Sequence, residues 1–312
     1  MTPPPHAARA DTADAPAATI LCSFDVDGTL MRSVNAPGSR ANALHKQAFS
    51  AAWERALGLQ AHIDDIKHDG GTDALILLKM AEHCGVDPAH ARAKLPEMQQ
   101  AMLDYYFGEK DGEGKQQEPK PKPGQGLELL PGAKETLEAL AARGPQVATC
   151  LVTGNLEPIG WAKMQALGID HLFSDPRFGG FGSDHCGGNT AEMWRDRAEF
   201  VRIARRRCAE EWGGGGGGGG GGSSSAGAGV SVSAHWHVGD TPADILAAVE
   251  AGASAIAVAT GAFGAEDLQK AADEALAAFK GSDGDGAPAP RVVVLEQGLR
   301  DVSEVLAAMG LS

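Results

Sequence analysis

Three apolar segments, each followed at once by small polar or acidic residues, constrain the fold of this chain more than any other feature. They span residues 20–24, 147–152 and 235–238. Each has the length and composition of a buried strand. In an open α/β fold the carboxyl ends of parallel strands meet at one edge of the sheet, and that edge binds the ligand. The pattern therefore predicts an α/β fold with a parallel sheet and one site at the strand ends.

The first apolar segment leads directly into Asp25-Val26-Asp27-Gly28-Thr29. Side chains alternate along a strand, so Asp25 and Asp27 are expected to point the same way. Carboxylate oxygens suit Mg²⁺, and a metal-neutralised phosphoryl group is open to attack by a carboxylate. The other carboxylate can then act as general acid and base. A solvated turn is the alternative interpretation, because Asp, Gly and Thr are common turn residues.

The second and third segments end in residues 153–155 (Thr-Gly-Asn) and 239–244 (Gly-Asp-Thr-Pro-Ala-Asp), and Lys163 follows the second on a predicted helix. With these motifs in this order, DxDGT, Thr, Lys and GDxxxD, the chain resembles the haloacid dehalogenase superfamily of phosphotransferases. The match spans almost the whole chain. The resemblance implies a Rossmann-like three-layer α/β/α core with a parallel sheet, and a small α-helical cap domain.

The resemblance also implies roles for the matching residues. Asp25 would be the nucleophile that forms an aspartyl-phosphate, and Asp27 would protonate the leaving group and then activate water. Thr153 would hydrogen-bond the phosphoryl oxygens. Asp240 would hold Mg²⁺ together with Asp25 and the Asp27 carbonyl, and Asp244 would lie behind, ordering the metal's water or the lysine. Further phosphate or substrate contacts are expected from Gly28, Thr29, Gly154 and Asn155.

The cation of the site is the least defined member of the set. Many relatives carry it in a Lys-Pro step near the last motif, and no such step lies between Asp175 and Asp240. In a subgroup with Thr-Gly-Asn the lysine stands on the following helix, which favours Lys163. Arg197 is the alternative. A lone helix lysine is otherwise usually a solvated charge.

The two carboxylates of the first motif narrow the expected reaction. Dehalogenases of the superfamily usually lack the second Asp, and phosphonate-cleaving members usually replace it with Ala, so Asp27 argues against both. We expect a Mg²⁺-dependent phosphomonoesterase acting on a small phosphorylated metabolite, either phosphoglycolate-like or a sugar phosphate. A sugar phosphomutase and a non-catalytic binding or scaffold protein remain alternatives.

The region between the first two motifs has helical apolar spacing over residues 41–59, 72–84 and 88–107. It resembles the helical cap of one branch of the superfamily, with residues 32–126 as the cap and residues 19–31 and 127–312 as the core. The natural hinges are residues 34–39 and 124–126. Gly71 and Thr72, in the loop most able to reach the cleft, are predicted substrate contacts, and Thr72 should also cap the next helix.

Low-complexity segments interrupt this plan. Residues 1–18 are expected to be a disordered leader rich in Ala and Pro, and residues 108–126 a solvated insertion or linker. Residues 213–229 are nearly all Gly and Ser. They lack the Gly-Lys-Ser/Thr step of a phosphate-binding loop, so we expect a flexible insertion within the core.

The formal net charge of −14 argues against nucleic-acid and anionic-membrane partners. No apolar run approaches the roughly 20 residues of a membrane helix. Five cysteines without a CxxC motif favour a reduced compartment, and with no secretory signal we expect a cytoplasmic protein. His235 and His237 alternate on one strand face, where packing or edge positions are favoured over a metal site. Oligomeric state stays open.

Overall fold

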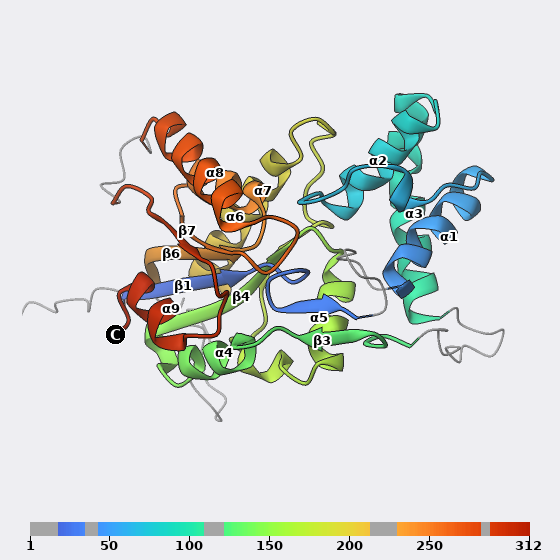
Figure 1. The fold of residues 1–312 in the computed structure, drawn as a ribbon. Helices are drawn as coiled ribbons and strands as arrows, with labels where there is room; N and C mark the ends of the chain where they lie inside the picture. Colours follow the sequence, from blue (N-terminus) through green and yellow to red (C-terminus); the bar gives the residue numbers. More distant parts are fainter. Residues whose placement is uncertain (1–17, 35–42, 109–121, 213–229, 282–287) are drawn as a thin grey trace, which may run out of the picture.

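The computed structural model describes residues 18–34, 43–108, 122–212, 230–281 and 288–312, and its centre is a six-stranded parallel sheet (Figure 1). The strand order is β5 (Gly179–Phe181), β4 (Val147–Thr153), β1 (Ala18–Phe24), β6 (Ser231–Gly239), β7 (Ser254–Val258) and β8 (Val292–Leu295). After β1 the chain forms β4 and β5 on one side of it, and then crosses back to form β6, β7 and β8 on the other side. The strand order therefore reverses beside β1, and ligands of open α/β sheets bind at such a point.

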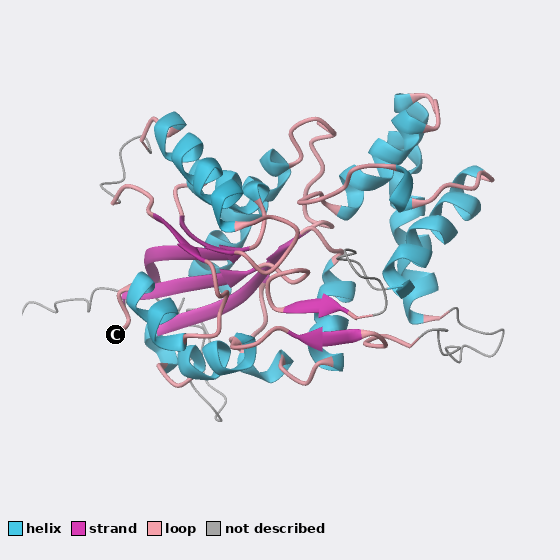
Figure 2. Ribbon diagram, in the orientation of Figure 1, coloured by secondary structure: helices cyan, strands magenta, loops and turns pink. Residues whose placement is uncertain are grey.

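Helices cover both faces of the sheet (Figure 2). One face carries α4 (Ala133–Ala141), α5 (Glu157–Ala166) and α9 (Val302–Met309), and the other carries α6 (Trp194–Arg207) and α7 (Pro242–Glu250), with α8 (Ala265–Ala278) beside α7. Strand alternation explains the two cores. Phe24 faces the first layer of helices, whereas Leu21 faces α6. The predicted three-layer α/β/α class is confirmed.

Three further helices form a separate unit beside the sheet, at the right of Figure 1. They are α1 (Ala43–Leu57), α2 (Asp73–His83) and α3 (Pro88–Phe107), and they lie in the segment that the sequence predicted to be helical. Their apolar faces share one core, which Leu156 and Ile159 from the start of α5 join. The unit therefore packs directly on the helix that follows the second motif.

A short antiparallel pair, β2 (Met31–Ser33) and β3 (Leu127–Leu129), lies where the chain leaves for the helical unit and where it returns. The Val34 amide donates to the Gly126 carbonyl at 2.9 Å, which extends this pairing. The ladder ties the outgoing and returning segments together beside the first motif. Most of the predicted hinge at residues 34–39 lies outside the described residues.

Local contacts set the ends of two helices on the faces of the sheet. Helix α6 starts at Trp194, and a short π-helix, Cys208–Trp212, follows it. Helix α9 starts at Val302, because the Asp301 carboxylate caps it by accepting from Ser303 N and Glu304 N.

The low-complexity segments contribute little to the described structure. Ala18, the last residue of the expected leader, already belongs to β1, and residues 1–17 lie outside the described residues. So do residues 213–229 and residues 109–121 of the other insertion.

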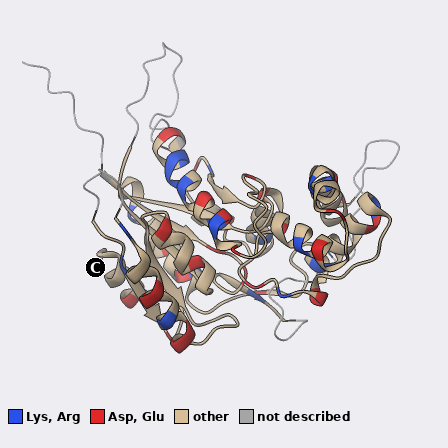
Figure 3. Ribbon diagram, turned by 90° about the horizontal axis from the view of Figure 1, so that it is seen from above, with Lys and Arg blue, Asp and Glu red and all other residues tan. Residues whose placement is uncertain are grey.

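All five cysteines are free. Among the described helices, none combines the length and the apolar character that crossing a membrane requires. Acidic and basic residues are interspersed along the ribbon (Figure 3).

Candidate active site

The turn after β1 carries the first two carboxylates. Gly28 has φ +90°, its amide donates to the Met31 carbonyl at 2.8 Å, and its own carbonyl accepts from Thr260 Oγ1 at 2.7 Å. A Cβ at Gly28 would lie 2.4 Å from Asp240 Oδ2. Glycine is thus required here both for the left-handed backbone and for the close approach of the third motif.

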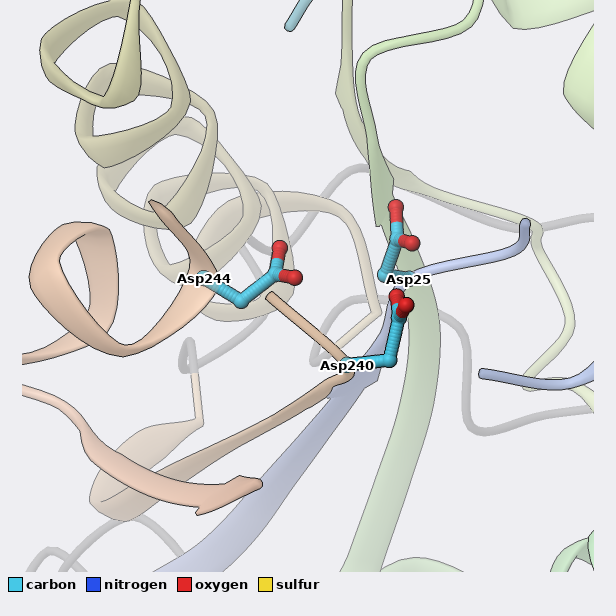
Figure 4. Close-up of side chains that lie close together, drawn as sticks. All are labelled: Asp25, Asp240 and Asp244. Carbon is cyan, nitrogen blue, oxygen red and sulfur yellow. The ribbon is translucent and has the colours of Figure 1, made fainter. Parts of the chain in front are cut away.

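Asp240 and Asp244 meet Asp25 at the carboxyl edge of the sheet (Figure 4). Asp25 follows β1, Asp240 follows β6, and Asp244 stands in the first turn of α7. The three carboxylates each offer an oxygen within 4.8 Å of the others, and all three side chains are buried. Thr29 Oγ1 donates to Asp240 Oδ1 at 3.3 Å, so Thr29 supports the cluster.

Arg197, from α6, connects two of these carboxylates. Its Nη1 lies 2.9 Å from Asp25 Oδ1 and 2.8 Å from Asp244 Oδ1, and its side chain is also buried. The other Asp244 oxygen accepts from the Thr241 amide at 3.0 Å and from Thr241 Oγ1 at 2.6 Å. Both oxygens of Asp244 are therefore committed to protein donors.

The cluster carries excess negative charge. Burial raises the pKa of Asp25, the charges of Asp244 and Asp27 raise it further, and Arg197 opposes them. For Asp244, burial is outweighed by Arg197 and by hydrogen bonds, so its pKa is lowered. Three ionised carboxylates against one guanidinium leave two negative charges, and hard oxygen donors with this excess fit a divalent cation.

Asp27 lies in different surroundings. Lys163 Nζ, which is fully buried, donates to Asp27 Oδ1 at 2.9 Å and to Oδ2 at 2.7 Å. Asn155 Nδ2 donates to Asp27 Oδ2 at 2.9 Å, and its Oδ1 accepts from Lys163. Burial alone would raise the pKa of Asp27, but the charge of Lys163 and these hydrogen bonds lower it. The structure therefore pairs Lys163 with Asp27, and Arg197 with Asp25.

His45, from α1, reaches this pair from the helical unit. Its Nδ1 lies 3.3 Å from Lys163 Nζ, and its Nε2 lies 3.1 Å from Asp73 Oδ2. An ammonium group can only donate, so Nδ1 accepts and Nε2 donates to Asp73. Asp73 Oδ2 also accepts from the Leu156 amide at 2.9 Å. Two elements of the helical unit thus hydrogen-bond to the core beside Asp27.

The loop before α2 lies against the second motif. A Cβ on Gly154 would be 2.4 Å from the Gly71 carbonyl, and the Asp73 amide donates to the Gly154 carbonyl at 2.8 Å. Thr72 Oγ1 accepts from the Leu75 amide, which confirms its predicted role as a helix cap. The helical unit is closed over the strand ends in this structure.

A cavity of about 60 Å³ lies between the strand ends and the helical unit. The strand-end side of its lining includes Asp25, Asp27, Gly154, Asn155 and Arg197. The helical unit contributes His45, Phe49, Ile63, His68, Gly70, Gly71, Asp73 and Ile76. The cavity therefore joins a charged floor to a roof that has both apolar and polar side chains.

The structure brings most of the predicted residues to this cavity or directly behind it. Thr153 is buried and its Oγ1 accepts from Asn155 Nδ2 at 3.0 Å, so it supports Asn155. Gly70 and Asp73 belong to the loop expected to reach the cleft and Thr241 to the third motif, whereas no site role was predicted for the other lining residues: His45, Phe49, Ile63, His68 and Ile76. His45 falls in an ordinary helical apolar pattern, and nothing in that pattern indicates its contact with Lys163.

Comparison with known proteins agrees with this geometry. The family model of haloacid dehalogenase-like hydrolases matches residues 21–209, more than half of the chain, and a related HAD-hydrolase-like model matches residues 200–280. The chain belongs to the haloacid dehalogenase-like hydrolase family. The resemblance and the expectation of a hydrolase are thus confirmed. No curated protein matches the sequence significantly.

Solved structures are similar to this chain at low sequence identity. A predicted phosphatase from Clostridium acetobutylicum is 12% identical with a TM-score of 0.50, over 93% of this chain and 100% of that one. A haloacid dehalogenase-like hydrolase from Streptococcus pneumoniae is 16% identical with a TM-score of 0.45, over 93% and 98%. A hydrolase from Pseudomonas syringae is 17% identical with a TM-score of 0.46, over 93% and 98%.

Proposed function

We propose that this member of the family is a Mg²⁺-dependent phosphatase of small phosphate monoesters that works through a phosphorylated Asp25. The observation that carries the proposal is the separation of two neighbouring carboxylates into unlike surroundings. Asp25 lies beside Arg197 and the acidic cluster, whereas Asp27 is held by Lys163 and Asn155. Neighbouring carboxyl groups with unlike partners can take unlike roles, here a nucleophile beside the acidic cluster and an acid–base held by two hydrogen-bond donors.

Asp25 is the proposed nucleophile. A phosphoryl group in the cavity would meet this carboxylate on the strand-end side, with Arg197 alongside to stabilise the charge on the transferring oxygens. Arg197 Nε is buried and has no hydrogen-bond acceptor within the described residues, so it is a donor available to such a group. Arg197 thus fits the role of the site's cation better than Lys163, which contacts Asp27.

Asp27 is the proposed acid and base. Its lowered pKa suits the second step, in which a carboxylate takes a proton from the water that attacks phosphorylated Asp25. In the first step the approach of the anionic phosphoryl group raises the proton affinity of Asp27, so that Asp27 takes up a proton from solvent water and passes it to the leaving oxygen as the ester bond breaks. Lys163 and Asn155 hold its orientation in both steps.

The donor set fits a divalent cation held by Asp25 and Asp240, with the Asp27 carbonyl as the third protein ligand that the family resemblance implies. Asp244 is committed to Arg197 and Thr241, so it supports the site from behind. Mg²⁺ supplies charge neutralisation here, which keeps Asp25 ionised and offsets repulsion between its carboxylate and a phosphate.

The cavity favours a small substrate. By the usual ~10–15 Å³ for one water, about 60 Å³ accepts roughly four waters, or a phosphoryl group with a short leaving group. Phe49, Ile63 and Ile76 line the roof where a leaving group would lie. Phosphoglycolate-like esters and small sugar phosphates remain the proposed classes.

The proposal is tested with p-nitrophenyl phosphate and a panel of small phosphate monoesters, in Mg²⁺ and then in EDTA. We expect Asp25→Asn to lose several powers of ten in kcat. The nitrophenolate leaving group needs no proton, so Asp27→Asn should still form the phosphoenzyme and then turn over slowly. Mass spectrometry should detect phosphorylated Asp25 in Asp27→Asn and not in Asp25→Asn.

Metal-independent release, or an Asp25→Asn variant that keeps more than a tenth of wild-type activity, would contradict the assignment. Release from no ester by folded protein that binds Mg²⁺ would favour a phosphomutase instead. Folded protein that neither binds Mg²⁺ nor releases phosphate would favour a non-catalytic role.

A further inference from the structure

A second polar cluster lies behind the acidic site, inside the sheet. Ser23 on β1 is paired in register with His237 on β6, and its Oγ lies 3.1 Å from His237 Nδ1 and 2.8 Å from His235 Nε2. All three side chains are at most 4% exposed. Buried polar groups are destabilising unless they hydrogen-bond, and apolar side chains are the usual occupants of such strand positions.

This cluster continues into the site. His237 Nε2 lies 3.4 Å from Asp244 Oδ1, the same oxygen that lies 2.8 Å from Arg197 Nη1. That Arg197 nitrogen in turn donates to Asp25 Oδ1 at 2.9 Å. A continuous series of hydrogen bonds, with one ion pair between Asp244 and Arg197, therefore connects His235, through Ser23, His237, Asp244 and Arg197, to the proposed nucleophile.

One set of proton positions satisfies the whole chain. Asp244 is an ionised acceptor, so His237 Nε2 must carry the proton that faces it. Neutral His237 then has a bare Nδ1, which accepts from the Ser23 hydroxyl. The Ser23 oxygen accepts from His235 Nε2–H, which leaves His235 Nδ1 bare. That atom is the one ring nitrogen of the pair without a partner in the described structure, and it is an acceptor in this scheme.

The opposite tautomer of His237 would be unfavourable. It would turn the bare Nε2 lone pair toward the Asp244 carboxylate, so two acceptors would face each other in a buried site. Asp244 would then keep its contacts with Arg197 and Thr241 but lose the hydrogen bond that His237 donates from β6. Asp244 prevents this, because an ionised carboxylate can only accept, and the Ser23 hydroxyl then donates to the bare Nδ1.

On this basis we propose that His237 is a positioning residue: through its Nε2–H it orients Asp244, and through Asp244 it orients Arg197 on Asp25. The inference rests on the proposed function, because it assigns Arg197 and Asp25 to phosphoryl transfer. His237 lies two residues before Gly239, the last residue of β6 and the first of the Gly-Asp-Thr-Pro-Ala-Asp motif. Nothing in that motif requires a histidine at this position.

The test compares His237→Phe with His237→Gln, using p-nitrophenyl phosphate and Mg²⁺. Loss of an outer hydrogen-bond donor typically lowers activity 10–100-fold. We expect a fall of about that size in kcat for His237→Phe with KM changed less than threefold. A glutamine amide can place an N–H near the position of Nε2, so His237→Gln should recover at least a third of the wild-type kcat.

His235→Phe is the matched control, since His235 lies on the same strand, is similarly buried and contacts Ser23, but does not touch Asp244. A purely structural role for these histidines predicts similar losses of stability and activity in both Phe variants. We expect similar losses of stability, but kcat within threefold of wild type for His235→Phe alone. Equal kcat losses in the two Phe variants would overturn the proposal.

The tautomer is measured directly by ¹⁵N NMR of histidine-labelled wild-type protein, which distinguishes protonated from bare ring nitrogens. We expect protonated Nε2 and bare Nδ1 for His237, both in wild type and in Ser23→Ala, because Asp244 stays an ionised acceptor in the variant. A protonated Nδ1 in wild type would refute the proposal even if His237→Phe failed to fold. Wild type that shows the expected tautomer but releases no phosphate would count against the proposed function, and would leave the hydrogen-bonded chain standing.

Discussion

Replacement of Lys163 by Met removes the positive charge from Asp27 while keeping a long unbranched side chain. Lys163 is fully buried and donates to both Asp27 oxygens, and Asp27 is itself only partly exposed. Breaking a buried ion pair by removing one member costs about 3–5 kcal/mol, because an uncompensated charge is left behind. Asp27 keeps 14% exposure, so we expect a loss of about 3 kcal/mol in the free energy of unfolding at pH 7.

The same reasoning predicts how that loss changes with pH. In wild type the pKa of Asp27 is lowered, so the pair stabilises the fold above the unfolded value of about 4, and this stabilisation is lost as pH falls through the lower folded value. In Lys163→Met, burial without the cation raises the pKa of Asp27. The ionised Asp27 carboxyl then destabilises the variant at pH 7. As pH falls, protonation of this carboxyl removes the unpaired buried charge and its cost in stability.

Urea unfolding of wild type and Lys163→Met in EDTA, at pH 7 and pH 5, measures both effects. We expect the difference in free energy of unfolding between wild type and Lys163→Met to be smaller at pH 5 than at pH 7. The double variant Lys163→Met/Asp27→Asn should be more stable than Lys163→Met alone by about 2 kcal/mol, because it lacks the unpaired charge. Two results together would refute the pairing of Lys163 with Asp27. The difference in stability between wild type and Lys163→Met would not change with pH, and the loss in the double variant would equal the sum of the losses in the two single variants.

Three smaller changes test other parts of the site. Gly154→Ala puts a Cβ 2.4 Å from the Gly71 carbonyl, so kcat/KM for p-nitrophenyl phosphate should fall at least tenfold, and unchanged kinetics would contradict the tight closure. Thr241→Ala removes a helix cap and the 2.6 Å hydrogen bond to Asp244, which should lower stability by about 1–2 kcal/mol in urea unfolding, whereas Thr241→Ser should stay close to wild type. Phe49→Ala enlarges the roof of the cavity, so it should lower KM for bulky esters relative to small ones, and a size-independent change across the ester panel would argue against Phe49 as a contact.

The sheet could be predicted from the sequence because its central strands have a recognisable local pattern. Strands β1, β4 and β6 are apolar runs that end in polar motifs, and neighbouring helices begin with recognisable caps such as Thr241. Strand β5 could not be predicted, because Gly179 and Gly180 show no side-chain alternation. Its glycines are explained by packing: a Cβ at Gly180 would lie 2.1 Å from the Phe200 carbonyl of α6.

Only those parts of the candidate site that stand in local sequence motifs could be predicted. Asp25, Asp27 and Asp240 follow their strands directly, so the strand order brings them together. The pairing of the cations could not be predicted, because helical spacing places Lys163 on a face without indicating which carboxylate it meets. Arg197 meets Asp25 through the packing of α6 across the sheet, and His45 meets Lys163 across the boundary with the helical unit.

The two cation pairings divide the site into halves of unlike charge. Lys163 neutralises Asp27, so this half is balanced without any ion. Arg197 is shared between Asp25 and Asp244 with Asp240 close by, so the other half keeps two negative charges in a buried position. This excess favours binding of the proposed divalent cation beside Asp25, whereas the Asp27 side needs no further positive charge. Under the proposed function, this division would let one turn of chain, Asp25 to Asp27, hold a metal-dependent nucleophile and a metal-independent proton carrier two residues apart.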